Sequence, residues 1–69
     1  MSSFYRTYLQ SAAWQAKREE ALEVAGYSCE ECGADGQLHV HHLTYARLGR
    51  EELDDLAVLC PECHEAAHL

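Results

Sequence analysis

The first third of the chain repeats its apolar positions with the period of an α-helix. One stripe of that helix carries Trp14, Arg18, Ala21, Leu22 and Ala25. Ser11 has a side chain that caps helix N-termini, and Gly26 suits the left-handed turn that ends a helix. We therefore predict a helix over residues 11–25 that acts as a scaffold, from which Lys17 and Arg18 could still contact phosphate.

The segment from Gln37 to His41 alternates between polar and apolar positions, which is typical of a half-buried strand. Leu38 and Val40 would share one face of this strand, and His39 and His41 would share the other. The strand therefore presents two histidines to one side and two apolar side chains to the core.

The rest of the chain predicts one more strand and one more helix. Residues 27–36 are rich in turn residues and suit a tight cysteine knuckle, and residues 43–55 form an irregular loop with a helical turn around 51–53. Leu56 to Leu59 is a short apolar run, long enough for a second strand. Pro61 stands where a final helix could begin. The fold class is therefore a small α+β domain in the order helix, knuckle, strand, loop, strand, helix.

The chain is short for a fold that depends on an apolar core alone. It has 69 residues, and a chain of this size buries only about 60% of its unfolded surface, so such a domain is marginally stable. We expect a single domain over residues 1–69 that something besides apolar contacts holds together. No apolar run approaches membrane-spanning length, so we expect a soluble chain without a membrane partner.

Two Cys-x-x-Cys pairs, Cys29/Cys32 and Cys60/Cys63, suit that purpose. The first residues carry no apolar signal segment, so we expect reduced thiols in the cytoplasm, with two disulfides as the alternative. Four thiolates around a tetrahedral Zn²⁺ make a closed site, so we predict a structural zinc ion. The 27 residues between Cys32 and Cys60 exceed the roughly 15 to 20 of a compact zinc ribbon and must build a further feature.

Charge argues against a broad basic surface for nucleic acid. The formal net charge is −7, from five Lys and Arg against twelve Asp and Glu. Six acids lie between Glu19 and Asp35 and six between Glu51 and Glu65, so the window from His39 to Arg50 has none. Arg47 and Arg50 lie in that window and are the candidates for phosphate contacts, with simple exposure as the alternative.

Three histidines form a candidate second metal site. His64 and His68 are four residues apart on the last predicted helix, so they share one face and can share a metal ion. His41 is a candidate third ligand if the end of its strand lies against that helix. Three imidazoles leave positions open on a divalent cation, which catalysis requires. The alternative is that these are ordinary polar histidines.

The neighbouring histidines are predicted to act differently from His41. Adjacent residues of a strand point to opposite faces, so His42 cannot join His41 on one ion unless the backbone bends. His42 would then be available to accept a proton from water, as a general base does. We expect His39 to contact solvent or to support a metal ligand rather than bind the ion itself.

Taken in order, these motifs resemble the HNH (His-Asn-His, ββα-metal or His-Me finger) endonuclease family. The resemblance spans residues 29 to 68 and lies in Cys29-x-x-Cys32, Val40-His41-His42-Leu43, Asp55-Leu56, Leu59-Cys60-Pro61-x-Cys63-His64 and His68. Any one of these motifs alone would be a weak signal, whereas the ordered set is specific. The resemblance implies a ββα-metal core over about residues 27–69, with the N-terminal helix packed on it.

Carried over by position, the resemblance assigns a role to each site residue. His42 is the general base, and His41, His64 and His68 hold a cation such as Mg²⁺, Mn²⁺, Ni²⁺ or Zn²⁺. The implied reaction is hydrolysis of a DNA phosphodiester bond that leaves a 5′-phosphate. Asp55 stands where the family name places Asn, the residue that orients the base; an Asp there could accept a hydrogen bond from His42, or could only cap a turn.

Other functions remain as alternatives. A non-catalytic zinc module, built on the four cysteines and binding a protein or nucleic-acid partner, would explain the acidic charge and the missing Asn. The run from His64 to His68 also matches the His-Glu-x-x-His signature of zinc proteases, but no third ligand follows it in the sequence. A homodimer stays open as well. Its surface would use side chains that could equally belong to the core, namely Phe4, Tyr5, Tyr8 and Leu9.

Overall fold

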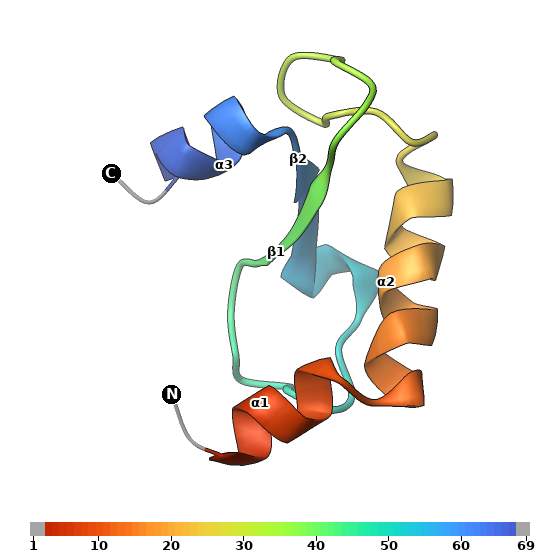
Figure 1. Ribbon diagram of the computed structural model, residues 1–69, viewed down its shortest axis with the longest axis vertical. Coiled ribbons are helices and arrows are strands. Elements are labelled where there is room, and N and C mark those ends of the chain that lie inside the picture. The colour runs from red at the N-terminus through yellow and green to blue at the C-terminus, as the bar shows by residue number, and fades with distance from the viewer. Residues whose placement is uncertain (1–2, 68–69) are drawn as a thin grey trace.

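The computed structural model describes residues 3–67, and the side chains from residue 4 onward (Figure 1). In chain order its elements are α1 (Ser3–Leu9), α2 (Ala12–Val24), β1 (His39–His42), the 3-10 turn η1 (Leu53–Asp55), β2 (Leu56–Leu59) and α3 (Pro61–Ala67). This is the small α+β architecture that the sequence predicts. Figure 1 shows the two paired strands at the centre, with α2 along one side and with α1 and α3 at opposite ends.

Helix α2 forms where its sequence predicts it. The hydroxyl of Ser11 accepts a hydrogen bond from the backbone N–H of Trp14 at 3.1 Å, so it caps the first turn. After the helix, Gly26 has a φ of 68° and Tyr27 a φ of 55°. Glycine adopts this left-handed conformation without a Cβ clash, which lets the chain turn away from the helix axis.

Helix α1 is an element that the sequence analysis did not anticipate. It has only seven residues, so it shows too few turns for an apolar stripe to stand out. Tyr8 and Leu9 pack against the core, whereas Phe4 stays 64% exposed. Of the side chains considered for a dimer surface, Tyr8 and Leu9 are thus covered within the chain itself.

Strands β1 and β2 pair antiparallel and form the centre of the domain. His39 lies opposite Leu59, and His42 lies opposite Leu56. The first strand covers 39–42, whereas the sequence predicted residues 37–41; the boundary moves because the chain still bends at Gly36 and Gln37. The buried core that packs on this hairpin consists of Trp14, Ala21, Leu22, Cys29, Leu38, Leu56, Val58, Leu59 and Cys60.

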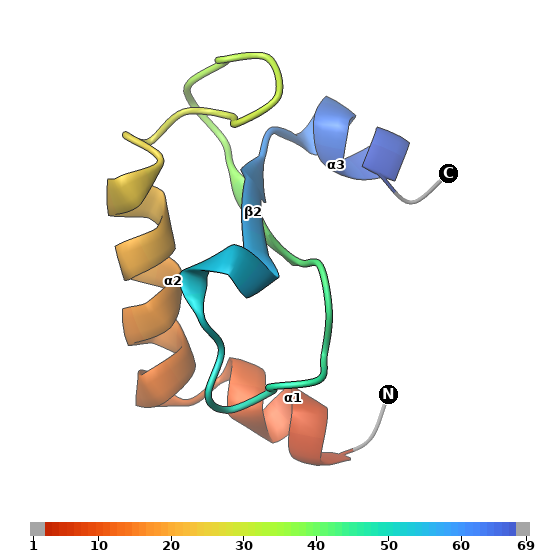
Figure 2. The ribbon, with the colours of Figure 1, turned by 180° about the vertical axis from the view of Figure 1, so that it is seen from behind.

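The knuckle is attached to the free edge of β2. The backbone N–H of Glu30 donates to the carbonyl of Val58 at 2.9 Å, and the Glu30 carboxylate accepts the N–H of Val58. These bonds satisfy the edge groups of a two-stranded sheet, which would otherwise face solvent. Figure 2 shows η1 leading directly into β2, and β2 into α3, so the knuckle, strand and last helix meet at one corner.

Among the described residues, no helix is both long enough and apolar enough to cross a membrane.

Candidate metal centres and histidine pocket

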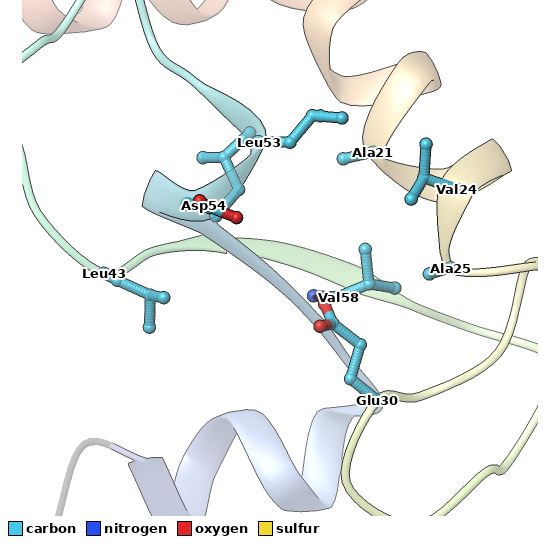
Figure 3. A pocket seen from close by; sticks show the side chains of 9 residues that line it. Ala21, Val24, Ala25, Glu30, Leu43, Leu53, Asp54 and Val58 are labelled. Atoms are coloured by element: carbon cyan, nitrogen blue, oxygen red, sulfur yellow. Dashed lines mark hydrogen bonds between the residues drawn. The ribbon is translucent and has the colours of Figure 1, made fainter.

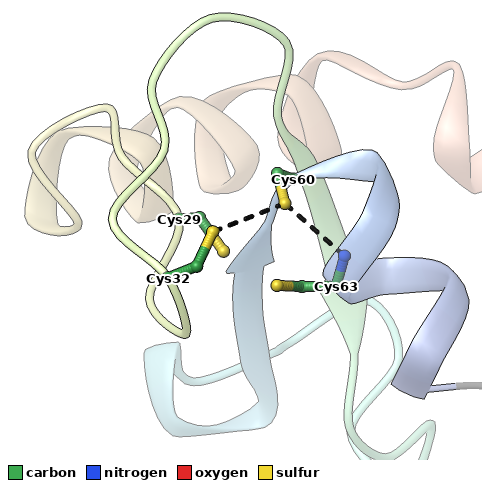
Figure 4. A group of neighbouring side chains, drawn as sticks. All are labelled: Cys29, Cys32, Cys60 and Cys63. Atoms are coloured by element: carbon green, nitrogen blue, oxygen red, sulfur yellow. Dashed lines mark hydrogen bonds between the residues drawn. The ribbon is translucent and has the colours of Figure 1, made fainter.

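Four cysteine sulfurs converge at the corner between the knuckle and α3. Cys29 and Cys32 come from the knuckle, Cys60 follows β2, and Cys63 lies on α3 (Figure 4). Their Sγ atoms all lie within 4.8 Å of one another, and those of Cys32 and Cys60 are 3.7 Å apart. Sulfurs that bind one Zn²⁺ at about 2.3 Å in a tetrahedron lie about 3.8 Å apart. The four cysteines can therefore hold a metal such as zinc, and all of them are free thiols rather than disulfides.

Short-range backbone bonds set the positions of these thiols. The N–H of Cys29 donates to the carbonyl of Ala34 at 2.8 Å, and the N–H of Gly33 donates back to the carbonyl of Cys29 at 2.9 Å. At the other pair, the N–H of Cys63 points at Cys60 Sγ at 3.5 Å. Cys-x-x-Cys spacing thus brings two sulfurs together within one tight turn at each position.

The thiols cannot all ionise in the absence of a cation. The backbone N–H of Cys60 donates to the Cys29 sulfur and lowers the pKa of Cys29 to about 6. By contrast, the neighbouring Cys60 and Cys29 sulfurs raise the pKa of Cys63. A divalent ion at the centre would offset the repulsion between thiolates, so the donor set fits a bound metal.

On a different face of α3 from Cys63, three histidines approach one another. His64 Nε2 lies 3.1 Å from His41 Nδ1, and His64 Nδ1 lies 2.8 Å from His39 Nδ1. His39 and His41 are two residues apart on β1 and therefore share one face of the strand. His64 reaches that face from the first turn of α3. His68, the fourth histidine of the predicted set, lies outside the described residues.

The separation of His41 and His64 fits two ligands of one cation. For nitrogens about 2.05 Å from a metal, ideal octahedral and tetrahedral angles place neighbouring nitrogens roughly 2.9 and 3.3 Å apart. The 3.1 Å between His64 Nε2 and His41 Nδ1 falls between these values. His39 then contacts the other ring nitrogen of His64, as the supporting partner of a ligand does.

His42 projects to the other face of β1 and is enclosed. Its residue is 7% exposed, and its ring stacks on Trp14 with centroids 4.7 Å apart and on Tyr45 with centroids 5.2 Å apart. The strand alternation that the sequence predicts therefore separates His42 from His41.

Glu51 is the partner of His42, a role that no motif in the sequence indicates. His42 Nε2 lies 2.8 Å from Glu51 Oε2, and the hydroxyl of Tyr8 donates to Glu51 Oε1 at 2.5 Å. Glu51 is only 4% exposed. Glu51 lies in an irregular loop, where no helix or strand periodicity indicates which side chains will be neighbours. Its contact with His42, nine residues earlier, follows only from the folded shape of that loop.

Asp55 was a candidate acceptor for a hydrogen bond from His42, but its carboxylate pairs with Arg47 instead. Its carboxylate accepts hydrogen bonds from both Nε (2.8 Å) and a terminal nitrogen of Arg47, and one from the N–H of Glu52 at 3.0 Å. The Arg47 guanidinium holds the pKa of Asp55 below its ordinary value. Asp55 thus ties the loop to the start of β2, and Arg47, a candidate phosphate contact, is shared with this buried carboxylate. Arg50, the other candidate, is exposed.

A pocket of about 260 Å³ joins the two histidine faces. Its lining includes His41, His42 and His64 together with the aromatic rings of Tyr5 and Tyr45. The larger groove, of about 430 Å³, lies between α2 and the η1–β2 segment and is mainly apolar around Leu53, Val24 and Val58 (Figure 3). No histidine or cysteine lines that groove. Another pocket, of about 420 Å³, is lined by His41 and Cys63 but by neither His42 nor His64. The pocket of about 260 Å³ contains all three histidines and is therefore the candidate site for chemistry.

Comparison with protein-family models decides the relationship. The HNH endonuclease model matches residues 29–69, which is more than half of the chain. The chain belongs to the HNH endonuclease family. The matched part of this HNH protein contains the four cysteines, the hairpin, the histidines and Glu51, whereas α1 and α2 precede it. A search of curated proteins and a search of solved structures found no match.

Family membership indicates a nuclease, and the described residues contain two of the three predicted cation ligands at a fitting distance. They also contain a candidate base close to those ligands. The site of this HNH protein therefore has the parts from which a specific function can be proposed.

Proposed function

We propose that this HNH protein is a metal-dependent endonuclease that hydrolyses phosphodiester bonds of DNA. The supporting observation is that His42 lines one 260 Å³ pocket with His41 and His64, whose facing nitrogens are 3.1 Å apart. Under this proposal His41, His64 and His68 hold a divalent cation such as Mg²⁺, Mn²⁺, Ni²⁺ or Zn²⁺, and Cys29, Cys32, Cys60 and Cys63 hold a structural Zn²⁺.

The hydrolysis itself needs one proton acceptor and one water molecule. His42 takes a proton from water, the resulting oxygen nucleophile bonds to phosphorus, and the bond from phosphorus to the 3′ oxygen breaks as that oxygen takes up a proton from solvent water. The product strand then carries a 5′-phosphate. The chemistry that the bound cation supplies is polarisation of the phosphate and stabilisation of the departing oxygen.

The chain has few groups for gripping a nucleic-acid backbone. Of its five Lys and Arg residues, Arg47 is already paired with Asp55 and Glu52, and Lys17 is paired with Glu20. Arg50 and Arg6 are exposed and are the candidate phosphate contacts. A chain of net charge −7 that neutralises few phosphates should bind DNA weakly and with a shallow salt dependence.

The proposal is tested by incubating supercoiled plasmid with the zinc-loaded protein and each of the four cations in turn. We expect nicked circles, loss of nicking in His42→Ala, and loss in His64→Ala. Because alanine leaves a void between two aromatic rings, His42→Gln is tested beside it, and the folding of each variant is checked by circular dichroism. No nicking with any cation, or undiminished nicking by folded His42→Gln, would contradict the proposal and favour a non-catalytic zinc module built on the four cysteines.

A further inference from the structure

We propose that Glu51 is the positioning residue of His42, held in place by Tyr8. On this view the Glu51 carboxylate keeps the proton of neutral His42 on Nε2 and leaves Nδ1 as the nitrogen that accepts a proton from water. The proposal rests on the nuclease function proposed above, but its central claim concerns a tautomer that can be observed without any activity.

For a neutral His42, the hydrogen-bond pattern around an ionised Glu51 allows one tautomer. Oε2 lies 2.8 Å from His42 Nε2, and Oε1 accepts the Tyr8 hydroxyl at 2.5 Å. An ionised carboxylate has no proton to donate, so the hydrogen in its contact with His42 must belong to Nε2. A neutral imidazole has one N–H, and Nδ1 therefore carries the lone pair.

The ionisation of both partners agrees with this arrangement. Burial acts to raise the pKa of Glu51, but the hydrogen bonds from Tyr8 and His42 outweigh it, and the pKa is lowered overall. Burial and the bond to Glu51 raise the pKa of Tyr8 to about 12. Near neutral pH the carboxylate is thus an acceptor only, and the phenol remains its donor.

The surroundings of His42 resist the alternative ring orientation. The ring lies between Trp14 and Tyr45, inclined by 23° to the first and by 25° to the second. Turning it over would remove Nε2 from Glu51 and leave a carboxylate oxygen without its donor in a side chain only 1% exposed. A buried carboxylate without its partner is costly, so the observed orientation is favoured.

The same contact would assist proton transfer. When His42 accepts a proton it becomes an imidazolium whose Nε2–H already points at a carboxylate. Both side chains are shielded from solvent, at 3% and 1% exposure, so water screens their attraction little. Glu51 would therefore orient the base without contacting the substrate.

The arrangement also gives α1 a role in the site. Tyr8 lies on α1, before the residues 29–69 that match the family model, and it reaches across 43 positions of sequence to Glu51. The loop that carries Glu51 is thereby fixed at both sides: by Tyr8 through one carboxylate oxygen, and by His42 through the other. The N-terminal segment thus contributes to the geometry of the proposed base.

The test compares zinc-loaded wild type with Glu51→Ala, Glu51→Gln and Tyr8→Phe. Long-range ¹H–¹⁵N spectra report which ring nitrogen of a histidine is protonated, and the His42 signals are those missing from His42→Gln. We expect protonated Nε2 in wild type and a mixture of tautomers in Glu51→Ala. Glu51→Gln should largely restore the Nε2–H form, because its amide oxygen can accept the same hydrogen bond, and Tyr8→Phe should retain it.

Nicking kinetics supply the second readout. A positioned general base contributes about 10²- to 10⁴-fold to rate, so we expect kcat to fall about 10- to 100-fold in Glu51→Ala with little change in KM. Glu51→Gln should recover part of that loss, and Tyr8→Phe should lose least. If Glu51→Ala does not fold, Glu51→Leu takes its place, because leucine fills the space but accepts no hydrogen bond from His42.

Unchanged tautomer and unchanged kcat per folded molecule in the variant whose residue 51 accepts no hydrogen bond would overturn the proposal and leave Glu51 a purely structural residue. If wild type nicks no plasmid but the tautomer shifts as described, the nuclease function fails and the assignment of Glu51 to His42 stands. The two claims are therefore separable.

Discussion

The indole of Trp14 lies against the imidazole of His42, with ring centroids 4.7 Å apart and ring planes inclined by 23°. Trp14 is on α2 and His42 ends β1, so this contact joins α2 to the proposed base. Packing against Trp14 thus holds one face of the His42 ring, and the contact with Glu51 holds its Nε2 atom. Packing and site geometry therefore depend on the same residues.

Replacing Trp14 should reveal both effects. Trp14→Ala removes a side chain that is only 5% exposed and should lower the free energy of unfolding by about 3–5 kcal/mol. Trp14→Phe keeps a ring against His42 and should cost clearly less. Urea denaturation followed by circular dichroism measures the difference. Tryptophan fluorescence cannot be used, because Trp14 is the one tryptophan of the chain. Equal costs for the two variants would show that a phenyl ring against His42 contributes nothing to stability.

Removal of the cysteine-bound metal should unfold the domain. The two-stranded sheet and the short helices bury a small core, and the four sulfurs join the knuckle to α3. We expect treatment with a strong chelator, or Cys29→Ser, to abolish the cooperative thermal transition seen by circular dichroism, and Zn²⁺ to restore it in the chelated wild type only. Identical melting curves with and without chelator would contradict a structural role.

Metal counting should separate the two sites. Wild type is expected to bind two divalent ions per chain, and His64→Ala to keep only the one held by cysteines. His39→Ala should retain both ions but bind the second about 10- to 100-fold more weakly, because His39 supports His64 from 2.8 Å. Isothermal titration with Ni²⁺ on the zinc-loaded protein measures this, with His42→Gln as the control that leaves the ligands intact. An affinity unaffected by His39→Ala would remove His39 from the site.

The ion pair of Asp55 and Arg47 should stabilise the protein throughout the neutral range. The bonds from Arg47 lower the pKa of Asp55 below 3.8, so the folded state favours the ionised form. That contribution is complete above the ordinary carboxyl pKa and is lost only as pH falls through the lowered value. We expect Asp55→Asn to have a lower urea midpoint than wild type, by an amount that does not change between about pH 8 and 5.5. A difference that shrinks within this range would argue against the assignment.

The local patterns of the sequence predicted several elements correctly. Ser11 and Gly26 mark the ends of α2 because capping and left-handed turns depend on single residues and their immediate neighbours. The Cys-x-x-Cys spacings predicted a four-sulfur cluster for the same reason. Strand alternation also separated His41 from His42, because successive side chains of a strand point to opposite faces.

Other features followed only from how distant segments meet. Helix α1 has too few residues for a periodic signal, and it is placed by the packing of Tyr8 and Leu9 on the core. The contact of His39 with His64 depends on the angle at which α3 leaves β2, which no local spacing encodes.

The sequence by itself thus determined the four-sulfur cluster, α2 and the opposite orientation of His41 and His42, since each depends on residues a few positions apart. Tertiary structure alone decided that Glu51, rather than Asp55, meets His42, and that Asp55 pairs with Arg47. All of these acids and the arginine lie within or at the end of one irregular loop. Which acid reaches the buried imidazole depends on how that loop closes over the hairpin, and on Tyr8 arriving from the far end of the chain.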